Sequence, residues 1–206
     1  MDSDDPITRA ILSDSVYERL RAGRFGWFKQ PLSRKLTVQG YLLHVLAAIL
    51  PILALLPPEI KQAYFSRSVV GAAPKVAVLA LVAVTVIGTA GAGLSAVGAF
   101  RLWRGDDFDE HTAQSVLNFE DLCSMLGLAT GTIATVATYL FVLVGFGGGK
   151  TLQAWIATGG GNPYAPSGYG LNVGTVAVTA LCIGVVLQVV STYLYARGLT
   201  EADIHL

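Results

Sequence analysis

The chain has 206 residues, of which 53% are hydrophobic and only 14% are charged. Soluble domains carry roughly 25% charged residues, so this composition argues against an ordinary water-soluble protein. The formal net charge is zero, so the chain has no overall basic field that would attract nucleic acid.

The first 35 residues precede any long apolar stretch and form a predicted cytoplasmic N-terminal segment. Apolar residues recur there beside several arginines, at Ile7, Ile11, Val16 and Leu20. This pattern predicts an amphipathic helix over residues 6–24 that lies on the membrane surface; the alternative is a flexible basic leader. Trp27, Phe28 and Lys29 follow, and two aromatic rings beside a cation are typical of an interfacial anchor.

Four long apolar stretches come next, over about residues 36–56, 76–102, 122–146 and 173–196. A membrane-spanning helix needs about 20 mostly apolar residues, and each stretch meets that length. The sequence therefore predicts an all-α integral membrane protein with a four-helix transmembrane domain over residues 36–196. Residues 197–206 form a predicted cytoplasmic tail.

Basic residues are distributed unevenly between the two sides of these spans. Most lie before the first span, between the second and third, or after the fourth: Arg9, Arg19, Arg21, Arg24, Lys29, Arg34, Lys35, Arg101, Arg104 and Arg197. Cytoplasmic segments carry the excess of Lys and Arg in multi-pass proteins. We therefore expect both termini to be cytoplasmic in a plasma membrane.

One proline and two loops give further predictions about the spans. Pro51 stands in the second half of the first span and predicts a kink there. Residues 103–121 are acidic and are interpreted as the inner loop, and residues 147–172 as a long glycine-rich outer loop.

Small residues recur at four-residue spacing inside the later spans. They are Gly88, Ala92 and Ala96 in the second span, Gly127 and Gly131 in the third, and Ala180 and Gly184 in the fourth. Association of helices in lipid depends on close backbone approach, which small residues permit. These residues are predicted to pack helices against each other or against other membrane subunits, with self-association as one form of that contact.

A polar layer is predicted inside the bilayer. His44, Ser95, Thr130 and Gln188 arrive at a similar depth from the four spans, at about 1.5 Å of rise per residue. Polar groups in hydrocarbon are expected to face the bundle interior and find partners there. The layer has two interpretations: interhelical hydrogen bonding, or a site for a proton, an ion or a quinone headgroup.

Other chemistry finds little support. The run Gly145–Thr151 resembles a phosphate-binding loop but has Val144 where the first glycine is required. The acidic cluster at 106–111 lacks the EF-hand pattern, and no nucleophilic triad is legible. We expect no cofactor, metal, nucleotide or nucleic acid, and two unpaired thiols at Cys123 and Cys182.

Three functions are compatible with these features. The first is a structural or accessory multi-pass subunit of a larger membrane complex, and it is the one that the packing residues favour. The second is a small oligomeric channel or transporter built around His44 and Gln188. The third is a membrane redox or quinone-binding protein.

Overall fold

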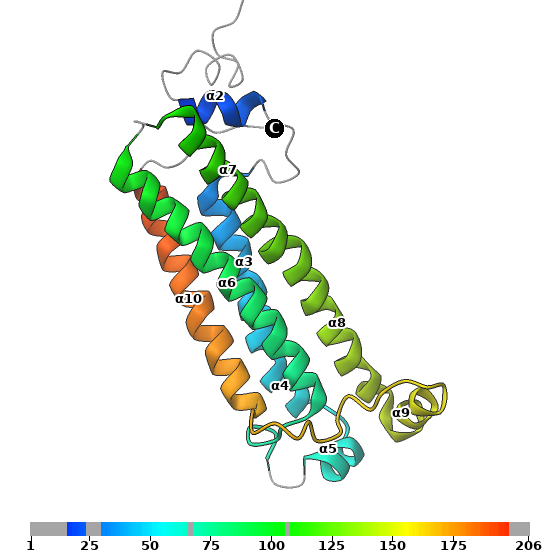
Figure 1. The fold of residues 1–206 in the computed structure, drawn as a ribbon. Helices are drawn as coiled ribbons and strands as arrows, with labels where there is room; N and C mark the ends of the chain where they lie inside the picture. The colour runs from blue at the N-terminus through cyan, green and yellow to red at the C-terminus, as the bar shows by residue number, and fades with distance from the viewer. Residues whose placement is uncertain (1–15, 24–29, 66–67, 106–107, 198–206) are drawn as a thin grey trace, which may run out of the picture.

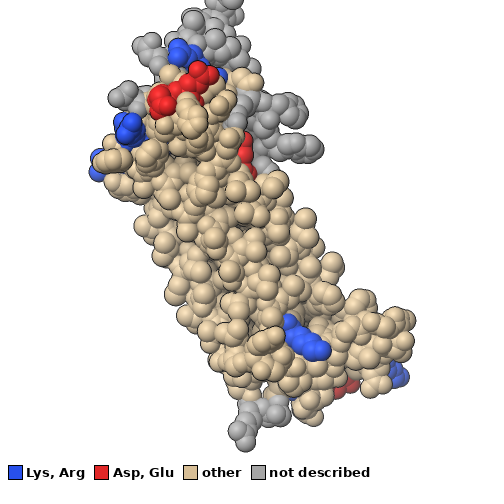
Figure 2. All heavy atoms as spheres, viewed as in Figure 1, with Lys and Arg blue, Asp and Glu red and all other residues tan. Residues whose placement is uncertain are grey.

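The computed structural model describes residues 16–23, 30–65, 68–105 and 108–197. Within these ranges, four helical segments are long and apolar enough to cross a membrane: Leu32–Ala54, Lys75–Arg104, Glu110–Ala157 and Val173–Ala196. They lie side by side in one elongated bundle (Figure 1). Charged side chains gather near its two ends, and the visible middle carries none (Figure 2). The described chain is therefore all-helical, with four helices of the length and apolarity that a multi-pass membrane protein requires.

The first span consists of two helices, α3 (Leu32–Ala47) and α4 (Ile49–Ala54). The break falls at Ala48, three residues before Pro51. Proline has no N–H to donate, and its ring collides with the carbonyl four residues back, so the helix cannot continue regularly. The kink expected at Pro51 is observed.

The second span, α6 (Lys75–Arg104), contacts α3, α8 and α10. It lies in front of α3 in Figure 1. Gly105 ends the helix with φ of 69°, a left-handed value that favours glycine. α6 and α3 each contact all three of the other spans.

The third span differs from the prediction at both ends. α7 (Glu110–Ser124) continues into a π-helical turn, η1 (Met125–Thr130), and then into α8 (Gly131–Val144). The interpretation of residues 110–121 as loop is therefore wrong. Asp109 starts the helix by accepting a hydrogen bond from the Thr112 amide, and the acidic first turn suits a helix N-terminus.

At the other end of the bundle, the predicted outer loop also contains helix. A short 3-10 turn, η2 (Gly145–Gly147), leads into α9 (Gly148–Ala157), which lies beside α5 (Pro58–Tyr64). Glu59 of α5 accepts a hydrogen bond of 2.8 Å from the Gly149 amide at the start of α9. The α9 end of the bundle is thus closed by two short helices.

The fourth span, α10 (Val173–Ala196), packs along α3. The short helix α2 (Val16–Gly23) lies across the opposite end of the bundle from α9, and we call this the α2 end (Figure 1). α2 forms part of the surface helix predicted over residues 6–24. The remainder of that prediction, and the anchor at Trp27, Phe28 and Lys29, lie outside the described residues.

Candidate functional site

A buried ion pair lies near the α2 end of the bundle. Lys35, in the first turn of α3, places its Nζ atom 2.6 Å from Oε1 of Glu120 in α7. Each residue is only 1% exposed. Lys and Glu are almost never fully buried unless they are paired, so each charge here depends on the other.

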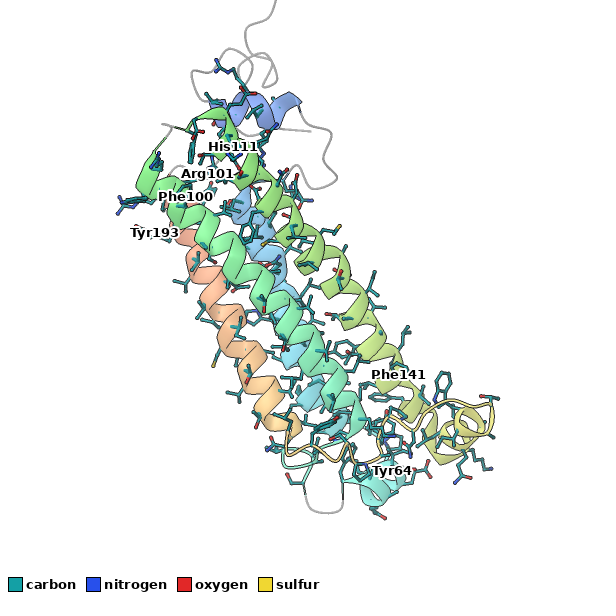
Figure 3. All side chains as sticks on the ribbon, viewed as in Figure 1. Tyr64, Phe100, Arg101, His111, Phe141 and Tyr193 are labelled. Atoms are coloured by element: carbon teal, nitrogen blue, oxygen red, sulfur yellow. The ribbon has the colours of Figure 1, made fainter. Side chains whose placement is uncertain are left out.

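Tyr17 of α2 also contacts Glu120. Its hydroxyl donates a hydrogen bond of 2.5 Å to Oε2 of Glu120, and the Arg101 guanidinium of α6 lies 4.1 Å from the centre of its ring. Figure 3 places Arg101 at the α2 end of α6. Burial raises the pKa of Tyr17 well above its usual range, and the negative charge of Glu120 adds to that shift. We call Tyr17, Lys35, Arg101 and Glu120 the Glu120 cluster; it joins four helices.

The cost of burying these charges argues that they have a role. Removing a charged group from water costs several kcal/mol, and replacing a buried pair by apolar residues of similar size is often neutral or stabilising by about 1–4 kcal/mol. Stability alone therefore does not require an ion pair at this position. Ionisable residues within membrane-spanning segments are functional-site candidates for the same reason.

One turn deeper, Gln39 lies on the same side of α3 as Lys35. It is fully buried, and neither Nε2 nor Oε1 has a hydrogen-bond partner. Its amide lies between two glycines from different helices: a Cβ added at Gly127 would be 1.9 Å from Nε2, and one at Gly91 would be 3.0 Å from Oε1. Only glycine at these two positions leaves room for the Gln39 side chain. We call this space the Gln39 niche.

The alignment of α3 with the third span explains why these contacts recur. Both helices start at the α2 end, so their residues pair in parallel: Lys35 with Glu120, and then Gln39 with Gly127. The next glycine, Gly131, is filled instead by Ile87 of α6, whose Cγ1 atom would be 2.4 Å from an added Cβ. The buried charges thus lie near the α2 end, whereas the buried polar residues beyond Ile87 on the third span, Thr135 and Thr138, donate to carbonyls of their own helix.

The predicted polar layer assembles only in part. His44 and Gln188 meet at the contact between α3 and α10, where His44 lies against Gly184 and Gln188 lies against Gly40. His44 Nδ1 is 2.7 Å from the carbonyl oxygen of Gly40 in its own helix. Ser95 likewise donates to its own helix, at the Gly91 carbonyl, and Thr130 is exposed. Ser95 and Thr130 therefore do not hydrogen-bond to the His44 and Gln188 side chains.

The predicted packing residues also divide into two groups. Gly127, Gly131, Ala180 and Gly184 are buried between helices, and Gly88 contacts Ile183. In contrast, Ala92 and Ala96 are exposed, so of the two predicted kinds of contact only packing against another subunit or a second copy is open to them. The neighbouring row on α6 does that packing instead, with Gly91 against Leu187 and Gly98 against Leu194.

The Glu120 cluster was not predicted, because Lys35 was interpreted as a topology signal and Glu120 fell in a predicted loop. The small-residue stripe of the third span could have indicated that Glu120 is buried. Extending the stripe of Gly127 and Gly131 backward by helical spacing reaches Ser124 and then Glu120, and all four residues are buried. The same helix face therefore carries both the packing glycines and the carboxylate.

A second hollow lies between loops near the α9 end. It has a volume of about 340 Å³ and is lined mainly by aromatic and small residues: Tyr64, Phe65, Ser68, Gly71, Ala72, Ala73, Pro74, Tyr164 and Pro166. Figure 3 shows Tyr64 on α5 at this end. Backbone hydrogen bonds from Ser167 to Ala73 and from Lys75 to Ala165 join its two loops, which fixes the shape of the hollow.

Within the described ranges, no group of three or more His, Cys, Asp or Glu side chains is placed to hold a metal ion. Cys123 is buried and Cys182 exposed, and both are free thiols as predicted. Comparison with protein-family models, with curated protein sequences and with solved structures gives no match.

Proposed function

We propose that this protein is a structural or accessory subunit that associates with other transmembrane helices, and that the outward face of α6 is its contact surface. The observation that carries this proposal is the size of the residues on that face. From residue 82 to residue 103 the exposed positions are Val82, Thr85, Thr89, Ala92, Ala96, Ala99 and Trp103. We call them the α6 outer face.

The α6 outer face differs from the exposed faces of its neighbours. α8 exposes large aliphatic side chains at Ile133, Val136, Leu140 and Leu143, and α10 does so at Val178, Leu181, Val185, Val186 and Val189. Such side chains suit contact with lipid tails. The centre of the α6 outer face has only alanine and threonine, which allow another helix to approach closely.

The spacing of these residues supports the same conclusion. Exposed positions on α6 alternate by three and four residues from Val82 to Trp103. This is the period at which two helices maintain contact along a left-handed crossing. The α6 outer face is therefore suited to contact another helix over about six turns, at 3.6 residues per turn.

The closed core favours this role over a channel within one chain. Ile87 fills the space beside Gly131, and the leucines Leu43 and Leu46 are fully buried nearby on α3. We further propose a plasma-membrane location with the α2 end on the cytoplasmic side, because Arg21, Lys35 and Arg101 lie there and basic residues favour the cytoplasm.

Cysteine cross-linking tests the contact surface. In a chain carrying Cys123→Ala and Cys182→Ser, a single Ala92→Cys or Ala96→Cys is alkylated in native membranes with a maleimide–benzophenone reagent and then illuminated, so that the cross-link needs no thiol on the partner. We expect a cross-linked product from either position, to a second copy or to another subunit that mass spectrometry identifies. The matched control is Val136→Cys on α8, from which no such product is expected. Equal cross-linking from α6 and α8, or none from α6, would contradict the proposal.

A further inference from the structure

The Gln39 side chain carries two polar groups into the middle of the bundle without a partner for either. Gln39 is 0% exposed, and its amide nitrogen and oxygen make no hydrogen bond. Buried polar groups in proteins are nearly always satisfied, by protein or by ordered water. An amide that is both a donor and an acceptor therefore needs something that the described chain does not supply.

The side-chain amide of Gln39 lies against the backbone of the third span as well as against apolar side chains. Gln39 lies against Gly127, inside the π-helical turn η1. The Gly131 amide that closes this turn bonds to the Leu126 carbonyl, five residues back instead of four. Such a change of register leaves a carbonyl without its usual amide donor, and π turns are found frequently at functional sites. The Gln39 amide thus lies beside a turn whose backbone hydrogen bonds depart from the α-helical pattern.

Polar side chains connect this niche to the α2 end. Ser124 lies between Glu120 and Gly127 on the inward face of the third span and is fully buried. Its hydroxyl donates to the Glu120 carbonyl at 2.7 Å. Lys35 and Gln39 follow the same course on α3, one turn apart. At the next layer Ile87 occupies the space beside Gly131, and the buried hydroxyls beyond it, of Thr135 and Thr138, are already bonded to carbonyls of their own helix.

We propose that the Gln39 niche is a water-binding site, reached from the α2 end past Ser124 and the Glu120 cluster and closed toward the α9 end by Ile87. The ligand has to accept from Nε2 and donate to Oε1 of an amide that lies against two glycines. Water is the smallest molecule that does both, and it occupies buried polar sites that offer two to four partners. The bundle is then wet to the depth of Gln39 and dry beyond it.

Water contact at Gln39 is measurable by NMR. The full chain is prepared in detergent micelles with ¹⁵N-glutamine and with protonated isoleucine methyl groups on a deuterated background. The Gln39 side-chain signals are assigned by their loss in Gln39→Met, or in Gln39→Asn if the first variant does not fold. We expect a cross-peak between the Gln39 amide protons and water, and none between the Ile87 methyl groups and water.

Measuring water contact at both Gln39 and Ile87 distinguishes the possible outcomes. No water cross-peak at Gln39 would overturn the proposal, and a dry unpartnered amide would then predict a higher unfolding midpoint for Gln39→Met than for the native chain. Water contact at both Gln39 and Ile87 would contradict a site that Ile87 closes. Water contact at Gln39 alone is the result that the proposed site requires.

Discussion

The hydroxyl of Tyr17 reaches across 103 positions of sequence to the carboxylate of Glu120, and this hydrogen bond of 2.5 Å ties the short helix α2 to the transmembrane bundle. Tyr17 is the one fully buried residue of α2 in the described chain, and it also contacts Phe108, with ring centres 6.1 Å apart. Val16 and Leu20 of α2 pack against the same small core. Tyr17 is thus the residue through which α2 contacts the buried carboxylate.

Replacing Tyr17 by Phe is expected to loosen α2 without removing the ring contacts. Hydrogen bonds to charged groups contribute about 1.5–3 kcal/mol, so the docked state of α2 should weaken by up to that amount. Trypsin cleavage at Arg19 and Arg21 measures the docking, and we expect it to become faster in Tyr17→Phe. The matched control is Tyr41→Phe, at a tyrosine that is 60% exposed, where cleavage should be unchanged.

The same contact predicts a dependence on alkaline pH. The pKa of Tyr17 is raised in the docked state, while an undocked tyrosine ionises near about pH 10. Docking is therefore unaffected below that pH. Above it, the undocked form loses its proton first, and stability falls as pH rises. Cleavage at Arg19 and Arg21 should accelerate above about pH 10 in the native chain, and much less in Tyr17→Phe. Equal pH profiles would show that Tyr17 does not control docking.

Replacing one partner of the ion pair should lower the free energy of unfolding more than replacing both partners. Lys35→Met leaves Glu120 buried without its partner, and losses of about 3–5 kcal/mol are typical of such changes. Lys35→Met combined with Glu120→Gln removes both charges, and we expect it to recover part of the loss. Unfolding in mixed micelles of increasing SDS content measures both variants. Additive losses would show that the two residues act independently.

The fit of Gln39 against Gly127 can be tested with a methyl group. Gly127→Ala would place its Cβ 1.9 Å from Nε2 of Gln39, and overpacking of a core typically costs about 1–3 kcal/mol. Shortening the neighbour in Gln39→Ala should relieve that clash, so the double variant should be more stable than the sum of the single changes predicts. The control is Gly88→Ala, where the nearest atom, on Ile183, is 3.4 Å away and little change is expected.

Hydropathy predicted the four spans because apolar length is a property of each segment alone. The kink was predictable from Pro51, since a proline disrupts the helix in which it lies. The start of α7 was missed because Glu110 and its neighbours are polar, and a helix that extends beyond the apolar zone leaves no hydropathy signal there. Helical spacing identified Ala92 and Ala96 as one face of a helix. Spacing alone does not identify the neighbour that a helix face contacts. In the structure, the face with Ala92 and Ala96 is exposed.

The long separation of Lys35 and Glu120 has a consequence for how the protein is made. Lys35 leaves the ribosome 85 residues before Glu120, so the first two spans enter the membrane while its charge has no carboxylate partner. A lysine near a helix end can hold its ammonium group at the water interface during that interval. Arrival of the third span then draws both charges inward together. We therefore expect the first helix to reach its final position only after Glu120 has been made, and chains that stop before Glu120 to remain open to quality control.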